Sequence, residues 1–169
     1  MHYRYRSGGF TLIELIITLA VLGIVLAFGV PAFNGVIENS RVTTQANTLL
    51  GAVNYARSEA VKRGETVSLQ SEAGGFDRGW CVILGPLDGC QNARDNDLLM
   101  REFGATRAVT VNAGGTVGVS FDHRGYRLAP AGNVVIAMQP DNCEENTSRR
   151  RELTVSAAGR ASLSGEECE

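Results

Sequence analysis

One carboxylate stands inside an otherwise apolar run near the start of the chain. The run extends from Phe10 to Phe33, which is 24 residues (33 − 10 + 1), and Glu14 is its only charged residue. As a helix it would be about 36 Å long at ~1.5 Å per residue, which is enough to cross a bilayer. A single carboxylate in such a span is costly, so Glu14 is predicted to have a functional role.

A short leader with two arginines precedes this run. The leader covers residues 1–9, and Gly9 stands directly before Phe10. Together with Glu14, the fifth residue beyond the junction, this pattern resembles the class III signal of type IV pilins and pseudopilins. The resemblance implies that a prepilin peptidase cleaves after Gly9 and methylates the new amino terminus on Phe10.

The same resemblance gives Glu14 a role in assembly. After cleavage, the α-amine of Phe10 is a cation at membrane depth, and a carboxylate of a neighbouring subunit can pair with it. Glu14 is therefore the predicted charge partner between subunits. The alternative is an ordinary secretory signal peptide cleaved near Ala27-Phe28-Gly29, which would leave a mature chain beginning near Val30.

The distribution of charge predicts the orientation of the chain. Arg4 and Arg6 precede the apolar run, so the positive-inside rule keeps them cytoplasmic and places the C-terminal part outside. The whole chain has 16 basic and 18 acidic residues, and removing the two leader arginines leaves 14 (16 − 2) against 18. This balance excludes a general attraction to nucleic acid and leaves only a local patch.

Four cysteines lie in the part predicted to be exported: Cys81, Cys90, Cys143 and Cys168. None belongs to a CxxC pair and neither histidine is near them, so no metal site is predicted. An even number of cysteines in an exported domain favours two disulfides. Three pairings are possible, and the short separations along the chain favour Cys81–Cys90 and Cys143–Cys168.

After Pro31 the apolar run gives way to an amphipathic pattern. Apolar residues then recur every three or four positions, at Val42, Ala46, Leu49, Val53, Ala56 and Ala60. Lys62 and Arg63 suit the negative end of a helix, and Gly64 suits its left-handed cap. One long helix is therefore predicted from about Phe10 to Arg63.

Beyond this helix, short β-like runs alternate with turn residues. The predicted strands are Thr66–Ser71, Gly79–Leu84, Leu98–Phe103, Val109–Asn112, Thr116–Asp122, Tyr126–Leu128, Val134–Gln139, Leu153–Ser156 and Ala161–Ser164. The fold class is α+β, with the helix packed on an antiparallel β-sheet domain. The predicted domains are a leader (1–9), a transmembrane or filament-core helix (10–33), the amphipathic half of that helix (34–64) and a C-terminal β domain (65–169).

Two stretches of the chain indicate which branch of the type IV pilins and pseudopilins it resembles. The letters ARSEAVKRG near the end of the predicted helix, and Arg78-Gly79-Trp80 ahead of a strand, resemble the GspH/FimT family of minor pilins and pseudopilins. Phe121-Asp122 with Gly125 nearby belongs to the same pattern. The resemblance implies a subunit that caps a filament or helps to start it.

No group of residues predicts catalysis or a cofactor. His123 is the only histidine outside the leader, and a lone histidine beside Asp122 and Arg124 is typical of a solvated turn. The pairs Gly74-Gly75 and Gly114-Gly115 lack the context of a phosphate-binding loop and are predicted to be hairpin turns. The chain is therefore predicted not to be an enzyme.

Three adjacent arginines, Arg149, Arg150 and Arg151, form the sharpest local charge, and Arg160 follows soon after. Such a group could hold DNA phosphates. Some members of the family bind DNA through a Gly-Arg-x-Arg stretch, but the stretch at Arg160 lacks the second arginine. The alternative is a solvated hairpin loop over residues 144–152, in which acids and bases neutralise each other.

Together these features predict a minor pilin of a type IV pilus, incorporated at or near the filament tip and promoting assembly. The alternatives are a GspH-like minor pseudopilin of the type II secretion system and a DNA-binding pilin for natural transformation. The expected partners are other pilins or pseudopilins, the prepilin peptidase, the inner-membrane assembly platform and the membrane. The expected location is the inner membrane, with one span and a periplasmic C-terminal domain, and then the filament.

Overall fold

One long helix, α1 (Leu12–Arg63), begins the folded chain. The computed structural model describes residues 10–168, without the side chains of residues 29–32 and 34. The chain divides into two compact units, residues 1–37 and 38–169, and α1 contributes to both. Helix α1 begins two residues later than predicted (12 − 10) and ends at the predicted residue.

Both ends of α1 carry the caps that their residues favour. Thr11 Oγ1 accepts a hydrogen bond from the backbone N–H of Glu14 at 3.3 Å, so Thr11 is the N-cap. At the other end, Gly64 adopts φ +71° and donates its N–H to Ala60 O at 3.0 Å. Only glycine adopts this left-handed conformation without strain, which explains where the helix stops.

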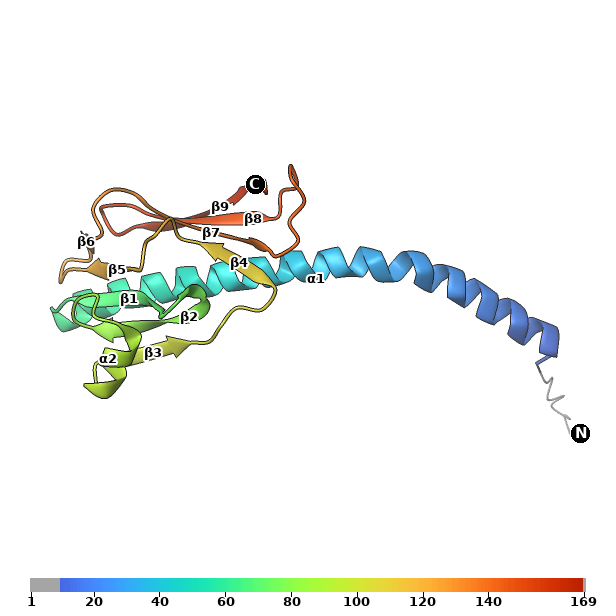
Figure 1. The fold of residues 1–169 in the computed structure, drawn as a ribbon, viewed down its shortest axis with the longest axis horizontal. Coiled ribbons are helices and arrows are strands. Elements are labelled where there is room, and N and C mark those ends of the chain that lie inside the picture. The colour runs from blue at the N-terminus through green and yellow to red at the C-terminus, as the bar shows by residue number, and fades with distance from the viewer. Residues whose placement is uncertain (1–9, 169) are drawn as a thin grey trace, which may run out of the picture. The chain divides into compact units, whose positions relative to one another are not determined.

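Nine strands and one short helix follow α1 within residues 65–168. They are β1 (Val67–Glu72), β2 (Gly75–Leu84), α2 (Cys90–Asp95), β3 (Leu99–Phe103), β4 (Val109–Asn112), β5 (Gly118–Phe121), β6 (Arg127–Ala129), β7 (Val134–Pro140), β8 (Arg150–Val155) and β9 (Ala161–Glu166). All pairings are antiparallel, and the strands form two sheets (Figure 1). The five-stranded sheet has the order β3-β2-β1-β5-β6, and the four-stranded sheet has the order β4-β7-β8-β9.

Two predictions about local structure were wrong in part, and one short helix was missed. Gly114-Gly115 form a turn, but this turn connects β4 to β5, which lie in different sheets, so it is not a hairpin. Residues 150–152 belong to β8 rather than to a loop, because the polar outer face of this strand hides the alternation that marks a strand. The six-residue helix α2 was not predicted, since its length gives too little periodicity.

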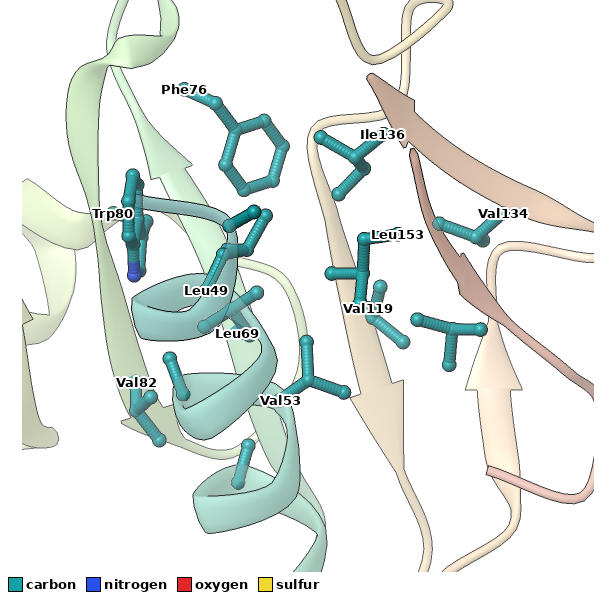
Figure 2. Packing of buried hydrophobic residues seen from close by; sticks show 14 of the residues in the cluster. Leu49, Val53, Leu69, Phe76, Trp80, Val82, Val119, Val134, Ile136 and Leu153 are labelled. Carbon is teal, nitrogen blue, oxygen red and sulfur yellow. The ribbon is translucent and has the colours of Figure 1, made fainter. Parts of the chain in front are cut away.

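The amphipathic stripe of α1 lies in a core that both sheets share. Its predicted members are all at most 1% exposed, and they are Val42, Ala46, Leu49, Val53, Ala56 and Ala60. Figure 2 shows Leu49 and Val53 between Trp80 and Val82 on one side and Ile136 and Leu153 on the other. Burying one Val or Leu side chain contributes roughly 1.5–3 kcal/mol, so this stripe fixes the helix against the strands.

A half-buried arginine ties α1 to both sheets at the same time. Arg57 Nε donates to Gly125 O at 2.9 Å, in the turn between β5 and β6 of the five-stranded sheet. Its Nη2 donates to Ala158 O at 3.3 Å, in the turn between β8 and β9 of the four-stranded sheet. One guanidinium can make both bonds because its donors point in different directions in one plane.

We expect Arg57→Ala to lower the free energy of unfolding by about 2 kcal/mol, because charge-assisted hydrogen bonds to two carbonyls are lost. Urea unfolding followed by fluorescence measures this directly, since Trp80 is the single tryptophan and is fully buried. Lys62→Ala, at a side chain 75% exposed, is the control and should change the value by less than about 0.5 kcal/mol. Equal effects of the two substitutions would contradict the bridging role of Arg57.

Candidate functional site

The first part of α1 exposes apolar side chains on every side. All large apolar residues between positions 10 and 28 are 52% to 82% exposed, and Phe10 is the most exposed of them. A helix that is apolar all round must be covered by lipid or by other helices. This segment is therefore the first candidate for an assembly surface.

Glu14 lies in the first turn of α1, and its side chain is exposed. It is the third residue after the Thr11 cap, which is the spacing of a capping box. A carboxylate at this position also suits the positive end of a helix, and the role of Glu14 between subunits stays a prediction. Phe10 precedes the cap, whereas Gly9, the predicted cleavage site, lies outside the described residues.

The hydropathy of the helices bears on the predicted membrane span. Within the described residues, no helix is both long enough and apolar enough to cross a membrane. The transmembrane helix over residues 10–33 stays a prediction.

Each arginine proposed for DNA binding at the start of β8 has a partner within the domain. Arg149 Nη1 donates to Glu38 Oε2 at 3.3 Å, and Arg150 Nη2 donates to Glu152 Oε1 at 2.6 Å. Arg151 Nη1 donates to two backbone oxygens, those of Ser148 at 3.4 Å and Arg150 at 3.0 Å. These contacts hold the guanidinium groups against the protein.

The fourth arginine of that prediction lies at the opposite end of the same hairpin. Arg150 pairs with Glu166 and Val155 pairs with Ala161, so the exposed Arg160 is next to the β8–β9 turn. Five residues of strand (155 − 150) separate the two ends, or about 17 Å at ~3.3 Å per residue. The structure therefore does not bring the four arginines together as one patch.

His123 is exposed in the turn between β5 and β6, as predicted, and its neighbour Asp122 organises that turn. Asp122 Oδ1 accepts the backbone N–H groups of Arg124 at 2.9 Å and Tyr126 at 2.8 Å. Burial raises the pKa of the Asp122 carboxyl, but these N–H groups and the Arg124 guanidinium lower it by more. The net pKa is below its ordinary value, so the carboxylate stays ionised and serves the turn.

This pKa shift predicts how stability depends on pH. The folded pKa of Asp122 lies below the unfolded one, so its contribution is complete above about pH 4 and is lost as pH falls through the folded pKa. We expect Asp122→Asn to lower Tm at pH 6 and the difference from the wild type to shrink towards pH 2. A difference that stays constant between pH 6 and pH 2 would contradict this assignment.

The cysteines are joined in the pairing that the spacing favours. Cys81 bonds to Cys90 with Cα atoms 5.9 Å apart, and Cys143 bonds to Cys168 with Cα atoms 5.7 Å apart. The first disulfide ties β2 to α2, and the second ties the end of the chain to the segment before β8. In the described part of the chain, no group of His, Cys, Asp and Glu side chains could hold a metal ion.

Comparison with protein families identifies two regions of the chain. Residues 45–159 match the family described as type II transport protein GspH. Residues 4–30 match the prokaryotic N-terminal methylation motif. The first match covers 115 residues (159 − 45 + 1), which is more than half of the chain.

Curated proteins with similar sequences are type IV pilins. A type IV major alpha-pilin of Moraxella bovis is 40% identical over 65 residues, which are 38% of this chain and 40% of the pilin. The type IV major fimbrial protein FimA of Dichelobacter nodosus is 31% identical over 99 residues, 56% of this chain and 60% of FimA. The chain thus spans about half the length of the curated relatives it matches.

Solved structures with the same fold include a minor pilin and a minor pseudopilin. The type IV minor pilin FimU of Pseudomonas aeruginosa superposes with a TM-score of 0.61 at 22% identity, covering 75% of this chain and 90% of FimU. The minor pseudopilin EpsH of the type 2 secretion system of Vibrio cholerae gives 0.50 at 9% identity, covering 74% and 97%. The long helix packed on antiparallel sheets is therefore a pilin fold.

Proposed function

This chain belongs to the family described as type II transport protein GspH, and we propose that it is a minor pilin, incorporated at or near the tip of a type IV pilus, where it promotes assembly. The observation that carries the proposal is the exposed apolar start of α1 with Glu14 as its only charge. The methylation motif at residues 4–30 includes the whole of this segment, from Phe10 to Phe28. The curated relatives, which are type IV pilins, support a pilus rather than another filament.

The mechanism is non-enzymatic and uses the N-terminal segment in two environments. Before assembly, the apolar side chains of α1 face lipid, and the subunit is held in the inner membrane with its β domain in the periplasm. Prepilin peptidase releases residues 1–9 and methylates Phe10. In the filament, the same side chains face other subunits, and Glu14 of one subunit pairs with the Phe10 amine of another.

The role of a minor pseudopilin in type II secretion is the second candidate. The family description and the likeness to EpsH favour it, and the same cleavage, anchoring and charge pairing apply. The partners would then be other pseudopilins and the secretion machinery. Natural transformation has less support, because the arginines proposed for DNA binding are engaged within the domain or lie at the far end of a hairpin.

Deletion of the gene, followed by mass spectrometry of sheared surface filaments, tests the proposal. A pilus role predicts that the protein is found in wild-type filaments at a low ratio to the major pilin and that the deletion reduces piliation. A normal pilus count with loss of secreted enzymes would instead support the pseudopilin. Normal piliation together with normal secretion would overturn both roles.

A further inference from the structure

A polar recess opens between α1 and the β3–β4 connection, within the globular unit formed by residues 38–169. It has a volume of about 410 Å³ and is lined by Ser40, Arg41, Thr44, Gln45, Ala105 and Arg107. The first four residues come from α1 and the last two from the β3–β4 connection. Residues 66 positions apart in the chain (107 − 41) thus place two guanidinium groups at one recess.

The charge of this recess is not balanced within the domain. Among the described residues that line it, none is acidic, and both Arg41 and Arg107 are exposed. No described carboxylate lies within ion-pair distance of either guanidinium. By contrast, Arg149, which also reaches α1, is neutralised by Glu38 at 3.3 Å. The recess therefore presents two positive charges and several hydrogen-bond donors to an external anion.

The loop that carries Arg107 is held in place by its own hydrogen bonds. Thr106 donates its backbone N–H to Asp77 O at 3.0 Å and its hydroxyl to Val109 O at 3.0 Å. On the helix side, the hydroxyl of Thr44 donates to Ser40 O at 2.8 Å. Both walls are thus fixed by contacts with the backbone, while the Arg41, Arg107 and Gln45 side chains make none of the hydrogen bonds described for the domain.

The position along the chain indicates which anion meets the recess. Arg41 lies in α1 eight residues beyond Phe33, where the apolar run ends (41 − 33), and four residues beyond Ile37, the last exposed large apolar residue of α1 before Val61. Four to eight residues of helix are about 6–12 Å long, and the headgroup layer on one side of a bilayer is roughly 5–7 Å thick, so the long side chain of Arg41 can extend back to that layer. Arginine at this depth is suited to lipid phosphates, which it binds through paired N–H donors.

We propose that this recess binds the phosphodiester headgroup of an anionic membrane lipid before the subunit enters a filament. The inference rests on the proposed function, because it requires α1 to be anchored in the membrane. Arg41 and Arg107 hold the phosphate oxygens, and Ser40 and Gln45 donate to the remaining oxygens or to the glycerol. Such contacts set the depth of the subunit in the membrane and the orientation of its globular unit before extraction.

The test uses the full-length chain in maltoside micelles, with bound lipid counted by native mass spectrometry. Phosphatidylglycerol, phosphatidylcholine and inorganic phosphate are titrated separately onto the wild type and onto Arg41→Gln/Arg107→Gln. The control is Lys62→Gln/Arg160→Gln, which removes the same charge at exposed positions outside the recess. At about 1 kcal/mol per arginine near a lipid surface, we expect phosphatidylglycerol to bind the first variant roughly 30-fold more weakly and the control unchanged.

The outcomes separate this inference from the proposed function. Equal binding of phosphatidylglycerol by both variants, or no preference over phosphatidylcholine, overturns the lipid site. Unchanged lipid binding with loss of cross-links to filament subunits in Arg41→Gln/Arg107→Gln also overturns it, because the anion is then a carboxylate of a neighbouring subunit. Recovery of the wild-type protein from the soluble fraction of cells overturns the membrane-anchored function itself.

Discussion

Glu14→Gln is expected to leave cleavage after Gly9 intact and to remove the subunit from assembled filaments. The substitution keeps the shape of the side chain and its capacity to cap α1, because glutamine also serves in a capping box. It removes the negative charge, so the Phe10 amine of the neighbouring subunit would be buried without a partner. Leaving one charge of a buried pair unpaired costs about 3–5 kcal/mol, which corresponds to a loss of incorporation of roughly 100-fold or more.

Quantitative immunoblots of sheared filaments and of membranes measure this effect. Thr11→Ala is the matched control, since it removes the capping hydroxyl that accepts the Glu14 N–H at 3.3 Å and retains the carboxylate. We expect Thr11→Ala to be incorporated almost normally, because loss of a cap costs only about 1 kcal/mol. Normal incorporation of Glu14→Gln, with loss for Thr11→Ala, would show that capping and not the charge pair matters.

The largest effect on stability is expected for Gly159→Ala, at about 3 kcal/mol or more. Gly159 adopts φ +74°, a conformation that costs an L-residue about 1–2 kcal/mol. In addition, a Cβ there would lie 2.1 Å from Gly125 O, the carbonyl that also accepts Arg57 Nε. The methyl group would therefore push apart the two turns that α1 joins.

Gly64→Ala provides the matched control for this position. Gly64 has nearly the same backbone conformation, φ +71°, but a Cβ added there would have no neighbour within 4 Å. Gly64→Ala should therefore lower the free energy of unfolding in urea by only about 1 kcal/mol, the cost of placing an alanine in this backbone conformation. Similar losses at Gly64 and Gly159 would contradict the close approach of the β5–β6 and β8–β9 turns.

Local patterns in the chain were sufficient to predict α1 and the positions of the strands. The stripe from Val42 to Ala60 has helical spacing, and the structure buries all of its members. Glycine marked the end of α1 because Gly64 must adopt a positive φ. The positions of all nine strands also follow from short runs bounded by turn residues, although their limits differ by several residues.

Features that depend on distant parts of the chain could not be predicted in this way. Strand partners in the two sheets are set by packing around α1, and no local pattern encodes that β4 pairs with β7 instead of β5. The bridging role of Arg57 and the meeting of Arg41 with Arg107 need contacts between residues more than 60 positions apart. In the sequence, Arg41 and Arg57 appear only as polar residues of a helix, and such residues are usually solvated.

The N-terminus of the mature protein tests the central claim most directly. Mass spectrometry of the protein purified from its native membranes would measure the N-terminal peptide. We predict a chain that begins at Phe10 with a methylated α-amine, because residues 4–30 match the N-terminal methylation motif and the proposed function requires cleavage after Gly9. A chain that begins near Val30, or one that retains the leader, would contradict this prediction.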